Sequence, residues 1–274
     1  MISGSRSKLI RSLKQKKYRD QHGLYLAEGD KVVLELIERS WDAAGNRDAA
    51  ASRSDQQPGH QIEELFATPD WIQSHRDLIE GKGIQANEAT PRELKKASNL
   101  VTPQQILALV RIPETSLDPS ALAGEPVLGF ESVRDPGNLG TIIRTADWFG
   151  IRYLVCTPDS VDLFNPKVVQ ATMGAMTRVR VHYLDPLELL DTPALKEKPV
   201  CGTFLDGENI YEATLPEHPM ILFGNESRGL SARLGQRVGL RLLIPSFTGN
   251  RPGSESLNLA SSVAVVCSEF RRRG

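Results

Sequence analysis

Cysteine is scarce in this sequence of 274 residues, which holds only Cys156, Cys201 and Cys267. The three lie far apart in apolar surroundings and show none of the close spacings of a metal site. An odd number of scattered cysteines also argues against a disulfide framework and favours buried thiols in a reducing cytoplasm. We therefore expect no bound metal, and we assign all three cysteines to the core.

Long hydrophobic runs are also missing. No apolar stretch reaches the roughly 18–20 residues needed to span a bilayer, so we expect no membrane segment. The first six residues are polar and then basic, without the apolar region of a signal peptide. A net charge of −1 lacks the excess of positive charge that marks many nucleic-acid binders. These absences together predict a cytoplasmic protein.

What is present is ordinary for a globular protein, with 40% hydrophobic and 24% charged residues. This length predicts about two domains. The first half alternates strands and helices, which predicts a small α/β domain over residues 1–118, including a linker at its end. A polar, Ala- and Ser-rich stretch at 42–60 predicts a mobile loop. The expected elements are a basic helix within 5–19, strands at 23–29, 65–68 and 104–112, and helices at 31–38, capped by Asp30, and at 69–79.

The second half, residues 119–274, also alternates. Several of its strands are continuous apolar runs, as in parallel sheets that are buried on both faces. The predicted fold class is therefore α/β with a parallel sheet, whose ligands bind at the carboxyl ends of the strands. The expected strands are 126–130, 153–156, 200–205, 220–223 and 240–244, and the expected helices are 141–149, 166–177, 186–190 and 257–272.

Positive charge is concentrated near both ends of the sequence. Residues 6–19 hold seven lysines and arginines without an acid, and three arginines occupy 271–273. A basic stripe of this kind can contact RNA phosphates. A solvated helix face explains the same pattern equally well.

Three short blocks place small or amide residues beside one ionisable group at expected strand ends. In the first block, 138–147, Asn138 follows a turn and opens a helix that carries Arg144, a combination typical of an anion site. In the second, 224–231, Gly224 permits a close approach of the backbone and Glu226 supplies a negative charge. An N-cap with a salt bridge and a simple turn are the structural alternatives for these two blocks.

The third block begins at Ile244, continues through a loop rich in Gly, Asn, Arg and Ser, and ends at 256–260, where Asn258 caps a last helix. The side chains of that helix are small and apolar. Such a helix packs tightly, against another subunit or a threaded chain, although an ordinary buried helix is also possible. The loop at 246–255 is long, and we hypothesise that Arg251 contacts RNA there.

Taken in order, the three blocks resemble the motifs of the SpoU (TrmH-type) branch of the SPOUT methyltransferases. Residues 164–175 resemble the family's segment between its first two motifs, and 24–29 with 32–34, together with 102–110, resemble its N-terminal RNA-binding domain. The resemblance implies a catalytic domain whose C-terminal segment forms a deep trefoil knot. It also implies a homodimer that transfers the methyl group of S-adenosylmethionine to a ribose 2′-hydroxyl in structured RNA.

Ribosomal 23S RNA is the expected substrate, because a separate N-terminal domain of this kind presents large RNAs. A tRNA ribose methyltransferase and an inactive RNA-binding protein are the alternatives. A dehydrogenase would need a Gly-x-Gly-x-x-Gly turn after its first strand, which this sequence lacks.

The resemblance also implies the site residues. Arg144 would orient the hydroxyl and stabilise the developing alkoxide. Glu226 would order Arg144 or the ribose, and Asn258 would fix the loop around the methyl donor. The implied catalytic set is Arg144, Asn138, Glu226 and Asn258, and the implied cofactor-binding set is Thr203, Leu205, Gly224, Asn225, Ile244, Ser256 and Leu257.

Overall fold

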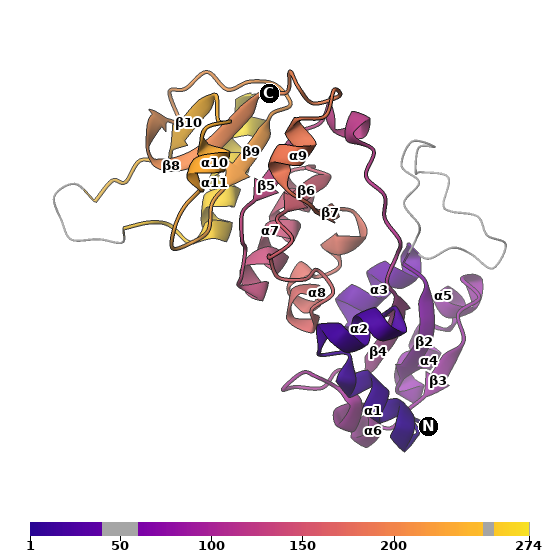
Figure 1. The fold of residues 1–274 in the computed structure, drawn as a ribbon. Coiled ribbons are helices and arrows are strands. Elements are labelled where there is room, and N and C mark those ends of the chain that lie inside the picture. The colour runs from indigo at the N-terminus through magenta and orange to yellow at the C-terminus, as the bar shows by residue number, and fades with distance from the viewer. Residues whose placement is uncertain (40–59, 249–254, 274) are drawn as a thin grey trace. The chain divides into compact units, whose positions relative to one another are not determined.

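The computed structural model describes residues 1–39, 60–248 and 255–273 (Figure 1). The chain divides into two compact units. Unit 1 consists of Met1–Ser116 together with Asp162–Thr177, and unit 2 consists of Leu117–Val161 together with Arg178–Gly274. Most of the stretch predicted as a mobile loop, 42–60, lies outside the described residues.

The segment Asp162–Thr177 joins unit 1, whereas the sequence placed it in the second domain. Its helix α8 (Pro166–Thr172) packs against strand β1 (Leu24–Glu28). The buried guanidinium of Arg19 also binds the Asp162 carboxylate, with Nη2 2.5 Å from Oδ2. Contacts between residues so far apart along the chain are invisible to a local pattern. The functional roles of the two predicted domains stay predictions.

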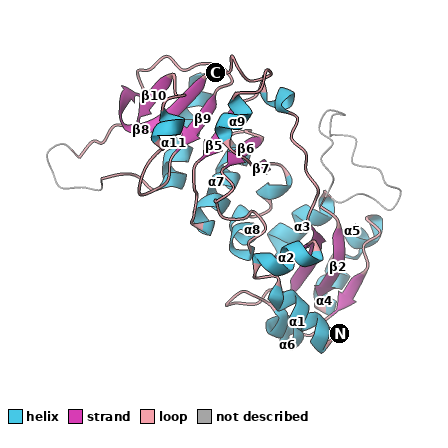
Figure 2. Cartoon of the chain, in the orientation of Figure 1, coloured by secondary structure: helices cyan, strands magenta, loops and turns pink. Residues whose placement is uncertain are grey.

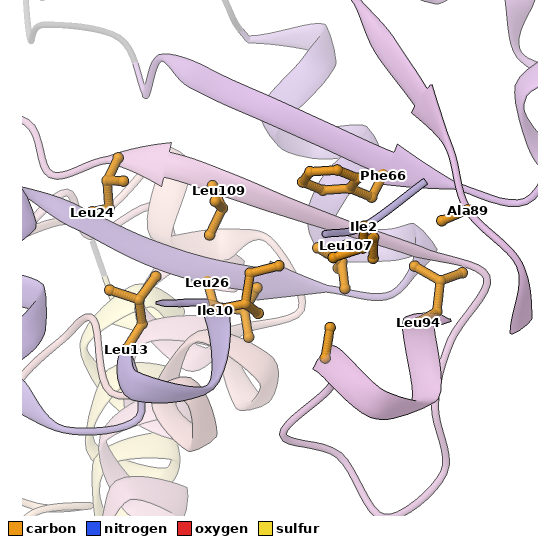
Figure 3. Close-up of a cluster of buried hydrophobic side chains, with 11 residues drawn as sticks. Ile2, Ile10, Leu13, Leu24, Leu26, Phe66, Ala89, Leu94, Leu107 and Leu109 are labelled. Carbon is orange, nitrogen blue, oxygen red and sulfur yellow. The ribbon is translucent and has the colours of Figure 1, made fainter. Parts of the chain in front are cut away.

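Unit 1 is built on a four-stranded mixed sheet in the order β1-β4-β2-β3. Figure 2 draws its strands in magenta and the helices around them in cyan. Strand β4 (Ile106–Arg111) is antiparallel to both β1 and β2 (Ile62–Ala67), while β3 (Ala86–Glu88) is parallel to β2. A core on one face of this sheet is drawn in Figure 3. Buried side chains from the strands meet those of α1 (Gly4–Ser12) and α6 (Pro91–Ala97), and include Ile10, Leu26, Phe66, Leu94 and Leu107.

Two predicted helices of unit 1 are each divided in two. The predicted basic helix is two helices, α1 and α2 (Lys16–His22), because the backbone of Gln15 between them is extended. The helix expected at 69–79 is α4 (Pro69–Ser74) and α5 (Arg76–Gly81), interrupted at His75. The prediction that Asp30 caps the next helix is wrong. Asp30 is the first residue of α3 (Asp30–Glu38), and its carboxylate accepts a hydrogen bond from the Trp71 indole at 2.9 Å.

Unit 2 contains a six-stranded sheet whose paired strands all run parallel, in the order β10-β8-β9-β5-β6-β7. The three central strands β9 (Met220–Phe223), β5 (Val127–Phe130) and β6 (Tyr153–Cys156) are buried throughout, because helices cover both faces. The flanking strands are β8 (Val200–Asn209), β10 (Leu240–Leu243) and β7 (Arg180–Tyr183). The predicted α/β fold class is confirmed, while the trefoil knot stays a prediction.

Helix α7 (Pro136–Trp148) begins five residues before the predicted start. Asp135 is its N-cap, since the Asp135 carboxylate accepts a hydrogen bond from the Asn138 backbone N–H at 2.7 Å. Asn138 therefore lies in the first turn and does not open the helix. The last helix, α11 (Leu259–Arg273), packs against α7. The shorter helices of unit 2 are η1 (Pro119–Leu122), α9 (Pro186–Leu190) and α10 (Ala232–Gly235).

The three cysteines are free and buried, as predicted. Burial raises the pKa of the Cys156 thiol to about 12, which keeps it protonated and unreactive at neutral pH. Among the described residues, no helix is both long enough and apolar enough to cross a membrane.

Candidate active site

The site residues predicted from the sequence follow the carboxyl ends of three strands of one sheet or lie within a fourth. Asn138 lies on α7 after β5, Gly224 directly follows β9, and Ile244 directly follows β10. Thr203 lies in β8, just beyond the Gly202 that pairs with β9. Because parallel strands end at the same edge of a sheet, these positions gather where α/β proteins bind their ligands.

A chain of hydrogen bonds joins all three sequence blocks. The Asn258 side-chain amide donates to Asn138 Oδ1 at 2.9 Å. The Asn138 amide in turn donates to Glu226 Oε1 at 3.0 Å. Each of these residues belongs to a different block, and three of the four predicted catalytic residues are therefore in direct contact.

Helix caps fix the positions of Asn138 and Asn258, the two asparagines in this chain of hydrogen bonds. The cap at Asp135 fixes the first turn of α7, which carries Asn138. At the other end, Asn258 Oδ1 accepts hydrogen bonds from the backbone N–H groups of Ala260 at 2.9 Å and Ser261 at 3.3 Å. The predicted cap of the last helix is confirmed. One Asn258 side chain thus starts α11 with its oxygen and binds Asn138 with its nitrogen.

The loop after β9 is closed on itself. The backbones of Asn225 and Gly229 exchange two hydrogen bonds, at 3.0 and 2.9 Å. A Cβ atom at Gly224 would lie 2.0 Å from the Gly229 carbonyl carbon, so only glycine fits there. The Asn225 side chain donates to the Ser132 carbonyl at 2.9 Å and so ties this loop to the segment after β5.

Arg144 takes no part in the chain of hydrogen bonds from Asn258 through Asn138 to Glu226. Its side chain is exposed on α7, about 9 Å along the helix axis from Asn138, and it has no hydrogen-bond or ion-pair partner in the described part of the chain. The Glu226 carboxylate accepts from the amides of Asn138 and Asn225, so it does not order Arg144 in this structure. Arg144 is free to meet a substrate.

The predicted cofactor positions lie around an irregular stretch of β8. Arg241 of β10 pairs with Gly202, but the next residue, Leu242, pairs with Glu208, so that residues 203–207 stand out of the ladder. Leu205 is 74% exposed and Leu257 is 52% exposed. Thr203 and Ile244 are partly buried, and Ser256 is exposed. Apolar side chains therefore face solvent at this edge.

A polar pocket of about 540 Å³ beside the bonded chain was missed from the sequence. Its wall includes Ser132, whose φ of 57° is unusual for a residue with a side chain. Hydrogen bonds from the hydroxyls of Ser132 and Thr157, together with the charge of Arg134, hold the pKa of Asp159 below its usual range. The only sequence signal was position, since Glu131 and Ser132 directly follow β5. The lining residues are Glu131, Ser132, Arg134, Asp159, Asn225, Ser227, Arg228, Gly229 and Ser231.

Comparison with known families decides the identity of this fold and site. The model of the SpoU rRNA Methylase family matches residues 125–268. The chain belongs to that family. A second model, the MRM3-like substrate binding domain, matches residues 5–45. The family predicted from the three sequence blocks is confirmed.

Relatives of this SpoU protein match it over nearly its whole length. The 23S rRNA (guanosine(2553)-2′-O)-methyltransferase RlmP of Bacillus subtilis (strain 168) is 28% identical, with 95% of this chain and 94% of the relative covered. A TrmH-family structure from Porphyromonas gingivalis has a TM-score of 0.80 and 33% identity, with both chains fully covered. An AdoMet-bound rRNA methyltransferase from Sinorhizobium meliloti has a TM-score of 0.79 and 25% identity, covering 100% of this chain and 97% of the other.

Two further predictions concern Arg251 and the expected absence of a metal. Arg251 lies outside the described residues, together with most of the long loop that contains it. Within 1–39, 60–248 and 255–273, no group of three His, Cys, Asp or Glu residues is placed to hold a metal ion.

Proposed function

We propose that this protein transfers the methyl group of S-adenosylmethionine to a ribose 2′-hydroxyl in 23S rRNA. The observation that carries the proposal is the chain of hydrogen bonds from Asn258 through Asn138 to Glu226, at the sheet edge where α/β proteins bind ligands. Membership of the SpoU family supports the reaction, and the 23S rRNA activity of the Bacillus relative supports the substrate.

The residues at the β8, β9 and β10 ends fit this methyl donor. Small-molecule sites are mostly apolar with a few placed polar groups, and the exposed Leu205 and Leu257 supply such a surface. The closed loop at Gly224 presents backbone groups without an intervening side chain. The residues proposed to hold the donor are Thr203, Leu205, Gly224, Asn225, Ile244, Ser256 and Leu257. When bound, S-adenosylmethionine supplies an electrophilic methyl group on a sulfonium sulfur.

The chain's own polar residues then act on the RNA. In the reaction the 2′ oxygen bonds the methyl carbon while the carbon–sulfur bond breaks, its electron pair stays on the sulfur of the departing S-adenosylhomocysteine, and the hydroxyl proton passes to solvent water. Arg144 orients the hydroxyl and stabilises negative charge on its oxygen, since a guanidinium with a pKa above about 12 is a poor base but a strong donor. Asn138 is held rigidly between Glu226 and Asn258 and positions the ribose beside it.

Unit 1 is proposed to bind the RNA. The substrate-binding model covers residues 5–45, which include the basic helices α1 and α2. Four cations on these helices and the turn between them, Lys8, Arg11, Lys14 and Lys17, are exposed and have no partner among the described residues. Free cations on one stretch can neutralise RNA phosphates and give an affinity that falls with salt.

A homodimer is the proposed assembly. The exposed side of α7 carries Thr141, Arg144 and Trp148, and Trp148 is 84% exposed. A tryptophan so exposed on a helix is typical of a surface that a partner covers. Light scattering of the purified protein should give twice the monomer mass, and Trp148→Glu should give the monomer mass. A wild-type monomer at micromolar concentration would contradict this assembly.

The deciding experiment maps ribose methylation at nucleotide resolution on total RNA from cells with and without the gene. One 23S rRNA site should be lost on deletion, restored by the intact protein, and not restored by Arg144→Ala. A lost site in tRNA would instead make tRNA the substrate. An unchanged map, together with no calorimetric binding of S-adenosylhomocysteine by the pure protein, would overturn the methyltransferase assignment.

A further inference from the structure

Apart from Asn225, the residues that line the pocket of about 540 Å³ have no role in the proposed methyl transfer. It lies between the segment after β5 and the loop after β9, both in unit 2. Its volume is in the range of small-molecule sites. Glu226, which follows the pocket residue Asn225, belongs to the bonded chain of the active site.

Most charges in the pocket wall are already satisfied. Asp159 binds Arg134 at 2.7 Å and also accepts hydrogen bonds from the hydroxyls of Ser132 and Thr157. The Glu131 carboxylate accepts a hydrogen bond from the Ser231 backbone N–H at 2.7 Å. These bonds hold the wall in place, and the charge of Asp159 is paired with that of Arg134, whereas Glu131 has a backbone hydrogen-bond donor.

Arg228 is the exception. It lines the pocket, it is exposed, and no described residue forms a hydrogen bond or ion pair with it. The neighbouring Gly229 has a φ of 68°, and a Cβ atom at that position would meet nothing within 4 Å. One uncompensated guanidinium thus stands beside open space in an otherwise satisfied pocket.

The lining also indicates what kind of group would enter. None of the nine lining residues is aromatic, so the pocket has no platform on which a nucleobase could stack. Arginine, serine hydroxyls and backbone N–H groups are instead the usual partners of phosphate oxygens in nucleic acids. The chemistry favours the sugar–phosphate backbone over a base.

The pocket is mechanically joined to the active site. Asn225 spans the two, because its side chain donates to the Ser132 carbonyl in the pocket wall while its chain neighbour Glu226 binds Asn138. A phosphate held here would fix the nucleotide whose ribose lies against Asn138. Positioning of this kind removes much of the activation free energy of a reaction between two bound partners.

We propose that Arg228 binds a backbone phosphate of the RNA substrate in this pocket and so positions the target ribose beside Asn138. This inference rests on the proposed methyltransferase function. It makes Arg228 a substrate-positioning residue with no contact to the methyl donor.

The test compares Arg228→Ala and Arg228→Lys with Arg233→Ala, which removes the same charge from an exposed arginine paired with Asp185. The RNA is 23S rRNA transcribed in vitro without modification. Arg228→Ala should lower the slope of log affinity against log salt by about 0.7–0.9. It should lower kcat/KM for methyl transfer roughly tenfold or more, the loss of one charged hydrogen bond. Arg228→Lys should keep the slope, because its charge remains.

S-adenosylhomocysteine affinity, measured by calorimetry, should be the same within twofold in all variants. A loss of that affinity in Arg228→Ala would place Arg228 in the donor site and overturn the inference. So would a salt slope equal to that of the wild type, or an equal loss in Arg233→Ala. If the wild type transfers no methyl group, the proposed function fails, while the salt slope still decides whether Arg228 holds a phosphate.

Discussion

Both ends of the chain carry clustered positive charge, but they differ in what binds that charge. Near the C-terminus, Arg271 donates to the Phe149 carbonyl at 2.7 Å and the Gly150 carbonyl at 2.9 Å, just past the end of α7. Arg272 and Arg273 both bind the Glu269 carboxylate. These arginines fasten α11 to its surroundings, and the sequence-based idea that they contact RNA loses its support.

Near the N-terminus the balance is reversed. Arg6 is paired with Glu64, Lys16 is paired with Asp20, and Arg19 is buried. The remaining four cations of residues 6–19 have no partner in the part of the chain that the structure describes. A run of basic residues therefore says little until the partners are known. Cations with partners stabilise the fold, and cations without partners are available to RNA.

Arg144 provides the strongest test of this rule, because it is unpartnered although it lies in unit 2. Arg144→Ala should lower kcat for methyl transfer about 10²–10³-fold, the usual loss of one donor to a developing oxyanion. Single-turnover methylation of 23S rRNA measures this. The matched control, Arg237→Ala, removes an arginine paired with Asp191 and should keep its rate. A rate for Arg144→Ala within threefold of the wild type would break the rule.

Arg19 tests the other half of this rule, that cations with partners stabilise the fold, because it has partners although four other cations of residues 6–19 have none among the described residues. Its guanidinium binds Asp162 and the carbonyls of Leu13 and Lys14. Arg19→Ala leaves these groups unpaired and should lower the free energy of unfolding by about 3–5 kcal/mol. Urea denaturation measures the change. Lys17→Ala, on the exposed face, should change it by less than about 0.5 kcal/mol, and equal effects would refute the distinction.

The free N-terminal cations should act on RNA binding alone. Replacing Lys8, Arg11, Lys14 and Lys17 with glutamine should lower the salt slope of 23S rRNA binding by roughly three, at about 0.7 per phosphate contact. Thermal stability should stay the same. Arg271→Gln should do the opposite, lowering the melting temperature and leaving the slope intact. A slope change in Arg271→Gln would return the C-terminal arginines to the RNA interface.

The smallest effect is expected at Glu269, the carboxylate partner of Arg272 and Arg273. Hydrogen bonds from Arg272, then Arg273, lower the pKa of this carboxyl from 4.5 to about 2. Since the folded pKa lies below the unfolded one, the stabilisation is complete above about pH 4.5 and is lost as the pH falls towards 2. Glu269→Gln should therefore cost about 1 kcal/mol at pH 7, and the difference should vanish in unfolding experiments near pH 2. A constant difference across this range would contradict the assignment.

The sequence predicted those parts of the fold that local pattern controls. Continuous apolar runs located β5, β6 and β9, because central parallel strands must be buried on both faces. Strand β7, with the sequence Arg-Val-His-Tyr, was missed because an edge strand needs only one neighbour and little apolar surface. The start of α7 was placed too late because Pro136 and Gly137 resemble a turn, although proline is favoured in the first turn of a helix.

The candidate site was predictable as a set of residues but not as a set of contacts. Strand ends and the family resemblance selected Asn138, Glu226 and Asn258. No spacing in the sequence predicts that Asn138 lies between the other two, because that arrangement depends on how distant segments pack. For the same reason the pocket at Arg228, formed by three separate segments, left no recognisable pattern.

The hydrogen bond from Asn258 to Asn138 also determines when, during synthesis of the protein, the active site can be completed. The two residues are 120 positions apart, and a ribosome makes them in that order. Asn138 lacks both partners until residue 226 has been added and one partner until residue 258 has been added, and α11 is made only after that. Catalytic competence therefore arises late in synthesis, after the sheet can already have formed, and a chain that stalls before Asn258 could fold much of unit 2 without gaining a complete site.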